Sequence, residues 1–399
     1  MTSNHGGSQV DVSEVTRNLS SLGGAKWDMH VRARALAAAG HPIIELTIGE
    51  PDEPMAPALL PAMAQALQAG RVGYSNGRGE AALLDALAAR YTARRGRVFS
   101  ADNFLAFPGT QTALYALMRG LVNPGDEVVV FDPCYATYEG VVAGAGATMV
   151  SAPLNPDTGF SIDFDALEAV LTPRTRAILL NNPHNPAGSL LDEGACMRLG
   201  ELAVQRGLWL ICDEVYEDLI YDNRPLVSPL NHAAFDGHAL GCASISKSHA
   251  APGLRSGWIV GAEEVVGQLV PLAETMLFGN QPFIADATAA ALGDSGETAA
   301  RMRESLRRRA QLVTAALDGV AGLRVAEPQA GMFALVGVGG SDLGLDGHAF
   351  ASRLLEQAGV AVMPGTSFGA VTRDWIRLSL TVPDEVLQRA CDRIAALCA

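Results

Sequence analysis

Two serines, a lysine and an arginine follow one apolar stretch of the chain, and together they have the chemistry of a phosphate and imine site. The strand-like run ends at Ser244 and Ser246, Lys247 comes next, and Arg255 follows eight residues later. Apolar neighbours at a strand end lower the pKa of a lysine, which can then act as a nucleophile or form a Schiff base. Two hydroxyls and a guanidinium suit a phosphate dianion. The set indicates pyridoxal phosphate, which proteins hold through a lysine imine; taken alone, a solvated Ser-Lys pair is the alternative.

A carboxylate ends a second apolar run, at residues 208–212. An ionised Asp213 in such a place needs a partner. A protonated pyridine nitrogen is one, and the pairing keeps the cofactor ring an electron sink. A metal ion is the alternative, but the neighbouring Glu214 points to the other side of a strand. We therefore predict that Asp213 binds a cofactor and that the chain has no metal site.

Three further strand ends carry residues suited to a flat, phosphorylated ligand. Thr110 opens a helix, where bare amides and a hydroxyl bind phosphate, unless it is an ordinary N-cap. Tyr135 follows the run 127–131 and could stack on a ring, or simply pack in its loop. Asn185 lies in the Asn-, Pro- and Gly-rich segment 181–188 and could reach a ligand oxygen, although such a segment also suits a turn-rich connection.

One arginine interrupts an apolar strand near the C-terminus. Arg377 lies within the run 375–380. A guanidinium in such a strand favours two-pronged capture of a carboxylate, and a structural ion pair is the alternative.

Alternating strands and helices must position these residues. Apolar runs at 104–107, 127–131, 147–150, 177–180, 208–212 and 240–245 are separated by helical stretches at 110–121, 138–145, 164–171 and 193–205. Strands that are apolar on both faces and alternate with helices predict an α/β fold with a mainly parallel sheet covered on both sides. Ligands of such sheets bind beyond the carboxyl ends of the strands.

The chain divides into a large and a small domain in this interpretation. Short strands and helices in the last hundred or so residues predict a smaller α+β domain, joined by a segment from the other end of the chain. We predict an N-terminal arm at 1–26, a large domain at 49–285, and a small domain made of 27–48 and 286–399.

Composition restricts the class of protein. The 399 residues carry a net charge of −14, with 49% hydrophobic and 18% charged residues, so the chain can fold around a sizeable core. Nucleic acid is an unexpected partner, because the one basic cluster, at 307–309, suits a solvated helix face. No signal sequence or membrane-spanning run is evident, and the six scattered cysteines suit reduced core residues. We expect a cytoplasmic protein.

Four motifs at characteristic spacing make the chain resemble the fold-type I pyridoxal-phosphate enzymes of the class I/II aminotransferase family. They are Asn-Asn-Pro-His-Asn-Pro-Ala-Gly (181–188), Asp-Glu-Val-Tyr (213–216), Ser-Ile-Ser-Lys (244–247) with Arg255 after it, and Arg-Leu-Ser (377–379). The resemblance extends from Trp27 to the C-terminus and implies a three-layer large domain. One departure is Ala187, where the family usually has threonine, and we expect it to leave the chemistry intact.

The resemblance assigns a role to each matching residue. Lys247 would form the Schiff base and carry protons, Asp213 would pair with the pyridine nitrogen, and Tyr216 and Asn185 would bind the phenolic oxygen. Tyr135 would stack on the ring. The residues expected around the phosphate are Gly109, Thr110, Gln111, Ser244, Ser246 and Arg255, together with Tyr74 from the partner subunit of a homodimer. Arg377 would bind the α-carboxylate of the substrate, assisted by Asn185 and the backbone of Gly49.

The substrate is less tightly specified. Relatives that act on dicarboxylates often use a partner-subunit arginine from the region after the lysine, but residues 260–300 contain no arginine or lysine. Acidic residues, notably Glu50 and Glu274, are expected near the mouth, where they would attract a cationic side chain or else form a solvated rim. The segments 27–30, 111–116, 276–279 and 331–333 are similar to the branch that includes arginine–pyruvate transaminase and capreomycidine synthase.

Two reactions and one binding function remain open at this point. The first is transfer of the amino group of an arginine-like amino acid to a 2-oxo acid, and the second is elimination and cyclisation of a hydroxylated arginine. Some proteins of this fold instead sense effectors within transcription regulators. That function is disfavoured, because residues 1–26 are too short and too weakly charged for a DNA-binding module, and both Lys247 and Asp213 are present.

Overall fold

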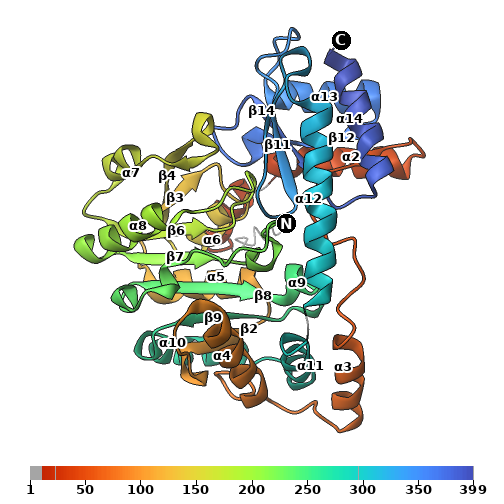
Figure 1. Ribbon diagram of the computed structural model, residues 1–399. Coiled ribbons are helices and arrows are strands. Elements are labelled where there is room, and N and C mark those ends of the chain that lie inside the picture. Colours follow the sequence, from red (N-terminus) through yellow and green to blue (C-terminus); the bar gives the residue numbers. More distant parts are fainter. Residues whose placement is uncertain (1–10, 23, 295, 399) are drawn as a thin grey trace, which may run out of the picture.

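The computed structural model describes residues 11–22, 24–294 and 296–398, and it places an eight-stranded sheet in the large domain (Figure 1). The sheet order is β2-β9-β8-β7-β6-β3-β4-β5, with parallel pairing from β8 through β4 and antiparallel pairing of β9 and β5 with their neighbours. Its strands are β2 (Phe104–Phe107), β3 (Glu127–Asp132), β4 (Thr148–Asn155), β5 (Ser161–Ile162), β6 (Thr175–Asn181), β7 (Trp209–Asp213), β8 (Ala239–Ser244) and β9 (Gly257–Gly261). The predicted α/β class with a mainly parallel sheet is confirmed.

Helices cover both faces of this sheet, as its apolar strands require. Along β3, Val128 and Val130 face one core, while Val129 and Phe131 face another. The first core lies under α5 (Thr110–Leu121), α6 (Tyr138–Gly144) and α10 (Glu263–Leu277). The opposite face carries α7 (Phe164–Val170) and α8 (Glu193–Arg206), and, beyond them, α4 (Ala81–Arg95) and α11 (Pro282–Leu292). Each fully buried aliphatic side chain in such a layer contributes about 1.5–3 kcal/mol to folding.

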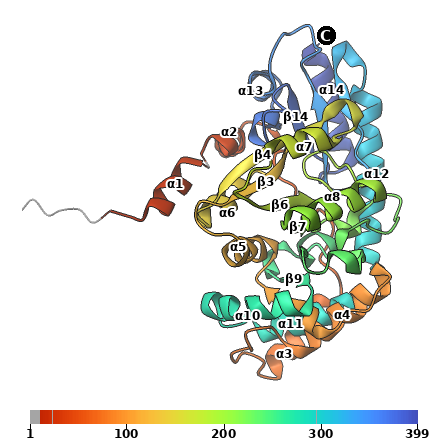
Figure 2. The same cartoon turned by 90° about the vertical axis from the view of Figure 1, so that its left-hand side faces the viewer.

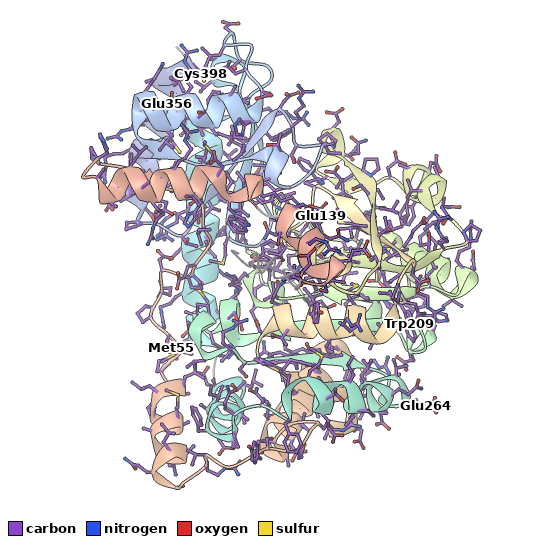
Figure 3. The ribbon with its side chains drawn as sticks, turned by 180° about the vertical axis from the view of Figure 1, so that it is seen from behind. Met55, Glu139, Trp209, Glu264, Glu356 and Cys398 are labelled. Carbon is purple, nitrogen blue, oxygen red and sulfur yellow. The ribbon has the colours of Figure 1, made fainter. Side chains whose placement is uncertain are left out.

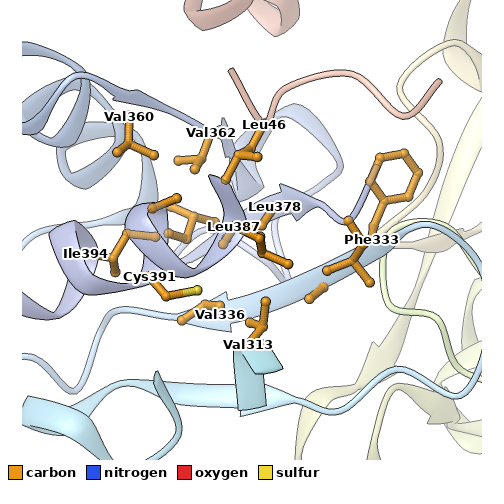
Figure 4. Close-up of a cluster of buried hydrophobic side chains, with 14 of the residues drawn as sticks. Leu46, Val313, Phe333, Val336, Val360, Val362, Leu378, Leu387, Cys391 and Ile394 are labelled. Carbon is orange, nitrogen blue, oxygen red and sulfur yellow. The ribbon is translucent and has the colours of Figure 1, made fainter. Parts of the chain in front are cut away.

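The small domain is built around an antiparallel sheet with the order β10-β11-β14-β13. Its strands are β10 (Arg324–Ala326), β11 (Phe333–Gly337), β13 (Met363–Pro364) and β14 (Trp375–Ser379), and its helices are α13 (Gly347–Ala358) and α14 (Asp384–Cys398). The buried side chains of Figure 4, among them Val336, Leu378 and Ile394, form its core. Two short strands, β1 (Ile44–Glu45) and β12 (Val360–Ala361), pair in parallel, so the segment that includes α2 (Asp28–Ala38) joins the C-terminal part.

The long helix α12 (Glu297–Leu317) extends along both parts of the molecule (Figure 1). Arg309, on this helix, pairs with Asp52 from the segment after β1 and with Asp384 at the start of α14. The sequence places a domain boundary at residue 285, which falls inside α11. That helix packs as a whole against α3 (Leu59–Gln68) and α4.

The N-terminal segment holds a helix that the sequence reading did not predict. Helix α1 (Glu14–Leu22) projects from the body and packs on α6 without a buried residue of its own (Figure 2). After it, Lys26 pairs at 2.5 Å with Glu139 of α6, and Glu139 is labelled in Figure 3. Residues 1–10 and 23 of the predicted arm lie outside the described residues.

Residues 11–22, 24–294 and 296–398 include no helix long and apolar enough to cross a membrane. All six cysteines lie among them, buried and unpaired. Within the same residues, no three His, Cys, Asp or Glu side chains come close enough together to hold a metal ion.

Candidate active site

A cavity of about 220 Å³ opens beyond the carboxyl ends of β6, β7 and β8 and is bordered by β14 of the small domain. The predicted site residues that line it are Gly49, Thr110, Gln111, Tyr135, Asn185, Asp213, Tyr216, Ser244, Ser246, Lys247, Arg255 and Arg377. Gly109 lies directly against Arg255. The topology therefore brings most of the predicted set into one place, as expected for the end of a parallel sheet.

Lys247 reaches into the cavity from α9 (Ile245–Ser248), a single turn that follows β8 directly. Its Nζ donates a hydrogen bond to the carbonyl oxygen of Gly49 at 2.7 Å. Burial lowers the pKa of Lys247 to about 8, and the nearby carboxylate of Glu50 opposes that effect. A substantial fraction of neutral amine is therefore present near physiological pH, as a nucleophile or a proton carrier needs.

Asp213 ends β7 in a fully enclosed position. Its Oδ2 accepts a hydrogen bond from the hydroxyl of Tyr138 at 2.7 Å, and its Oδ1 accepts one from the amide of Val215 at 3.2 Å. Burial nevertheless raises the pKa of Asp213 to about 6, because two hydrogen bonds do not replace full hydration. The adjacent Glu214 turns away and pairs with buried Arg95.

The start of α5 is a candidate anion site. Gly109 precedes this twelve-residue helix with a φ of 84°, and no side chain caps its first amides. A Cβ at Gly109 would come within 2.3 Å of an Arg255 guanidinium nitrogen. The hydroxyl of Thr110 is buried without a hydrogen-bond partner in the described residues. Bare amides, an unpartnered hydroxyl and a guanidinium form the surroundings that a phosphate group needs.

Arg377 lies between two aromatic rings. Its guanidinium carbon is 3.8 Å from the ring centre of Phe333 and 4.4 Å from that of Phe368. It donates to the side-chain oxygen of Asn185 at 3.2 Å and to the carbonyl of Thr47 at 2.7 Å. Burial lowers the pKa of Arg377 to about 10, a value at which it stays charged near neutral pH. A desolvated guanidinium held this rigidly is ready for a carboxylate.

Phe333 also explains the glycine at position 49. A Cβ on Gly49 would lie 2.3 Å from the tip of the Phe333 ring. The Phe333 ring thus stacks on the guanidinium of Arg377 and leaves no room for a side chain at position 49.

Besides Gly109, three predicted residues do not line this cavity. Tyr74 is 90% exposed and packs edge-on against Phe278, with ring centres 5.4 Å apart. The side chain of Glu274 packs against Gly77 in the loop after Tyr74. Glu50 is exposed and lines a neighbouring depression of about 500 Å³. The partner-subunit role of Tyr74 and the substrate roles of the two glutamates stay predictions.

The residues present fit pyridoxal phosphate. The anion site suits its phosphate, buried Asp213 suits its ring nitrogen, and Lys247 is an amine of lowered pKa on the same cavity wall. Tyr216 and Asn185 lie on that wall too and can bind its phenolic oxygen. The chemistry of the group matches each donor set.

Sequence reasoning missed three aromatic side chains around the site. Tyr138 supports Asp213, and Phe333 and Phe368 enclose Arg377. A further lining residue, Trp27, enters the sequence analysis only as the beginning of the family resemblance and as part of the segment 27–30, with no role in the site. Tyr138 follows Tyr135 by three residues at a helix start, which is a usable signal, whereas the phenylalanines are indistinguishable from core residues in the sequence.

Comparisons with known proteins agree with this geometry. The family model described as aminotransferase class I and II matches residues 41–394. The chain is 40% identical to arginine–pyruvate transaminase AruH of Pseudomonas aeruginosa over 387 residues, 97% of this chain and 98% of that protein. It is 32% identical to aspartate/prephenate aminotransferase of Cereibacter sphaeroides, over 92% of this chain and 94% of that protein. The solved structure of Thermus thermophilus aspartate aminotransferase with maleate superposes with a TM-score of 0.90 at 28% identity, over 98% of this chain and all of that one.

Proposed function

Because this chain belongs to the class I and II aminotransferases, a family of enzymes that use pyridoxal phosphate, we propose that it moves the α-amino group of an arginine-like amino acid to a 2-oxo acid. The family and the aminotransferase class rest on the matched length and on the fold. The proposal concerns the substrate, the individual residues and the assembly.

The residues of the cavity supply each step of such a transfer. When bound, pyridoxal phosphate provides an electron sink next to the α-carbon of the substrate. Asp213 keeps a proton on the pyridine nitrogen, since a buried carboxylate is most stable beside a positive charge. The amine of Lys247 would take up the proton of the substrate α-carbon and would later give a proton back. Arg377 holds the α-carboxylate in place throughout.

The observation that carries the arginine-like substrate is the match to arginine–pyruvate transaminase. It extends over nearly the full length of both proteins at 40% identity, whereas the aspartate/prephenate relative from Cereibacter sphaeroides is 32% identical. The cavity supports the same choice. Its two lining arginines, Arg255 and Arg377, are taken by the proposed phosphate and α-carboxylate sites, and residues 260–300 supply no further cation for a second substrate carboxylate.

Acidic residues near the cavity favour a cationic side chain. Glu50 lies close enough to Lys247 to affect its pKa, and it lines the adjoining depression together with Glu45, His30 and Arg34. A substrate guanidinium directed toward this depression would gain from Glu50, while Glu45 is already paired with His30 and Arg34 is itself a cation. We keep Glu50 in the proposed substrate site, with Glu274 as a residue that a neighbouring subunit could bring closer.

We also propose a homodimer with shared sites. Tyr74 and Phe278 form an exposed aromatic pair, which is unusual for a surface that stays in water. In the family arrangement expected from the sequence, Tyr74 binds the phosphate of the partner's cofactor. Light scattering should give a dimer mass, and Tyr74→Phe should weaken cofactor affinity while the mass is unchanged.

The experiment that tests the substrate is a single-turnover comparison without any 2-oxo acid. Holoenzyme is mixed separately with arginine, aspartate and leucine, and the apparent second-order rate constant is followed through cofactor absorbance and the 2-oxo acid formed. Arginine should react fastest and give one 2-oxo acid per active site. A faster reaction with aspartate or leucine would contradict the proposal. In a parallel reaction with 3-hydroxyarginine, a cyclic amino acid formed over many turnovers would instead establish elimination and cyclisation.

A further inference from the structure

Most of the cavity wall has a role once the cofactor and the α-carboxylate are placed. The charged lining residues are Asp213, Lys247, Arg255 and Arg377, and the proposed function uses all four. No other charged side chain of the described residues lines the cavity. Glu50 lies in the adjoining depression, so the cavity wall itself offers the substrate side chain no unused carboxylate, and an aromatic face is the group of that wall that can attract a cation.

Five aromatic residues line the cavity, and four of them are engaged. Tyr138 donates to Asp213, Phe333 covers Arg377, and Tyr135 and Tyr216 lie where the cofactor ring and its phenolic oxygen are proposed to bind. Trp27 is the fifth. Its indole N–H makes no hydrogen bond within the described residues, and the side chain is half-buried.

The position of Trp27 is fixed by contacts from distant parts of the chain. It ends the turn Ala25–Trp27, whose Lys26 carbonyl accepts a hydrogen bond from Ser367 at 2.8 Å. The Lys26 side chain pairs with Glu139 on α6. These contacts hold the turn between the two domains, so the indole has a defined place on the wall.

The indole lies one side chain away from the carboxylate-binding arginine. Trp27 packs against the cluster that contains Phe368, and the Phe368 ring lies 4.4 Å from the guanidinium carbon of Arg377. An amino acid held at Arg377 by its carboxylate would extend its side chain along the same wall. Trp27 thus packs against this cluster and also lines the cavity, within reach of a ligand bound there.

We infer that Trp27 is a specificity-determining residue, whose indole face stacks on the planar guanidinium of the substrate. This inference rests on the proposed function and deepens it. Guanidinium suits the position better than ammonium does, because it is flat, weakly hydrated and stacks on aromatic faces. Loss of a cation–aromatic contact of this kind corresponds to roughly a threefold to thirtyfold change in affinity, depending on how much water is excluded.

The test compares substrates whose side chains differ in charge and in whether they end in a planar group. Wild type, Trp27→Leu and Trp27→Phe holoenzymes are assayed in single turnover with arginine, with citrulline, which is planar and neutral, and with norleucine. Trp27→Leu should lower the rate constant for arginine roughly threefold to thirtyfold and change those for citrulline and norleucine by less than about twofold. Trp27→Phe should fall between wild type and Trp27→Leu, because a smaller ring retains part of the attraction.

A binding measurement with unreactive analogues compares wild type and Trp27→Leu without any amino-group transfer. 5-Guanidinopentanoate and hexanoate lack the α-amino group, so they bind without reacting, and calorimetry on holoenzyme gives both affinities. The ratio of the association constant of 5-guanidinopentanoate to that of hexanoate should be above one in wild type and should be lower in Trp27→Leu. If Trp27→Leu loses cofactor or melts early, Trp27→Met, whose flexible side chain adapts better to the space beside Phe368, gives the same comparison.

The outcomes separate the two proposals. A wild type that reacts no faster with arginine than with norleucine would overturn the arginine-like substrate, and this inference with it. A wild type that prefers arginine, combined with a Trp27→Leu that slows all three substrates equally or leaves the affinity ratio unchanged, would overturn the role of Trp27 alone. In that case Trp27 serves only to pack the turn.

Discussion

Replacing Asp213 with asparagine should stabilise the cofactor-free protein while removing its chemistry. Asp213 is 4% exposed, and the pKa of its carboxyl group in the folded chain is about 6, compared with about 3.9 for an unfolded aspartate. A pKa difference of about 2 corresponds to about 3 kcal/mol. The sign follows from proton binding, since between these two pKa values the folded state binds more protons than the unfolded state. Ionised Asp213 therefore destabilises the fold fully above pH 6, and not at all below about pH 4.

An asparagine at this position should avoid the penalty without losing its neighbours. Its amide oxygen can accept from Val215, and its NH₂ group can donate to the Tyr138 hydroxyl, which accepts as well as donates. We expect cofactor-free Asp213→Asn to be about 1–3 kcal/mol more stable than wild type at pH 7.5, with the difference shrinking toward zero near pH 4.

The assay is urea unfolding of cofactor-free protein at several pH values and one protein concentration. Asp85→Asn, on the exposed face of α4, is the matched control and should leave the midpoint unchanged. Added pyridoxal phosphate should raise the midpoint of wild type more than that of Asp213→Asn, because only the carboxylate pairs with the ring nitrogen. An asparagine variant that is less stable at pH 7.5, or a difference that does not vary with pH, would refute the reasoning.

Three further predictions follow from the same geometry. Cofactor-free enzyme should bind pyridoxal phosphate covalently at a rate that rises with pH around a midpoint near 8, because the neutral amine of Lys247 is the nucleophile. A rate that does not change with pH in stopped-flow measurements would contradict this. Arg377→Lys should raise the apparent Kd for an amino acid about tenfold to a hundredfold, since ammonium cannot make the two-pronged contact. Equal Kd values for wild type and Arg377→Lys would exclude Arg377 as the carboxylate site. Gly49→Ala should reduce activity at least tenfold through its collision with Phe333, and Gly49→Ala combined with Phe333→Leu should recover part of that loss; no recovery would exclude the collision as the cause.

Much of the fold was predictable because its signals are local. The run before Asp213 is apolar on both faces, and such a run identifies an interior parallel strand and its carboxyl end without any tertiary information. Helix α1 was missed, although Val12, Val15 and Leu19 have helical spacing, because polar residues dominate that segment. Strand β9 was missed because its five residues follow the lysine loop with no helix between them.

The site residues were predictable from the sequence where the residue type itself indicates a particular chemical role. A lysine, an aspartate and an arginine at strand ends are conspicuous, since burying each of them is costly. Phe333, Phe368 and Trp27 carry no such cost, and their roles depend on which charged group the fold places beside them. The sequence therefore predicts the reacting groups better than the aromatic surfaces that orient them.

The central claim, that this cavity holds pyridoxal phosphate on Lys247, has one direct test. The chain contains only two lysines, Lys26 and Lys247, so borohydride reduction of the holoenzyme followed by peptide mass spectrometry gives an unambiguous assignment. We predict one phosphopyridoxyl group per chain, on the peptide that contains Lys247, and none after reduction of Lys247→Ala. A modification at Lys26, or an unmodified Lys247 in protein that retains its cofactor absorbance, would contradict the account.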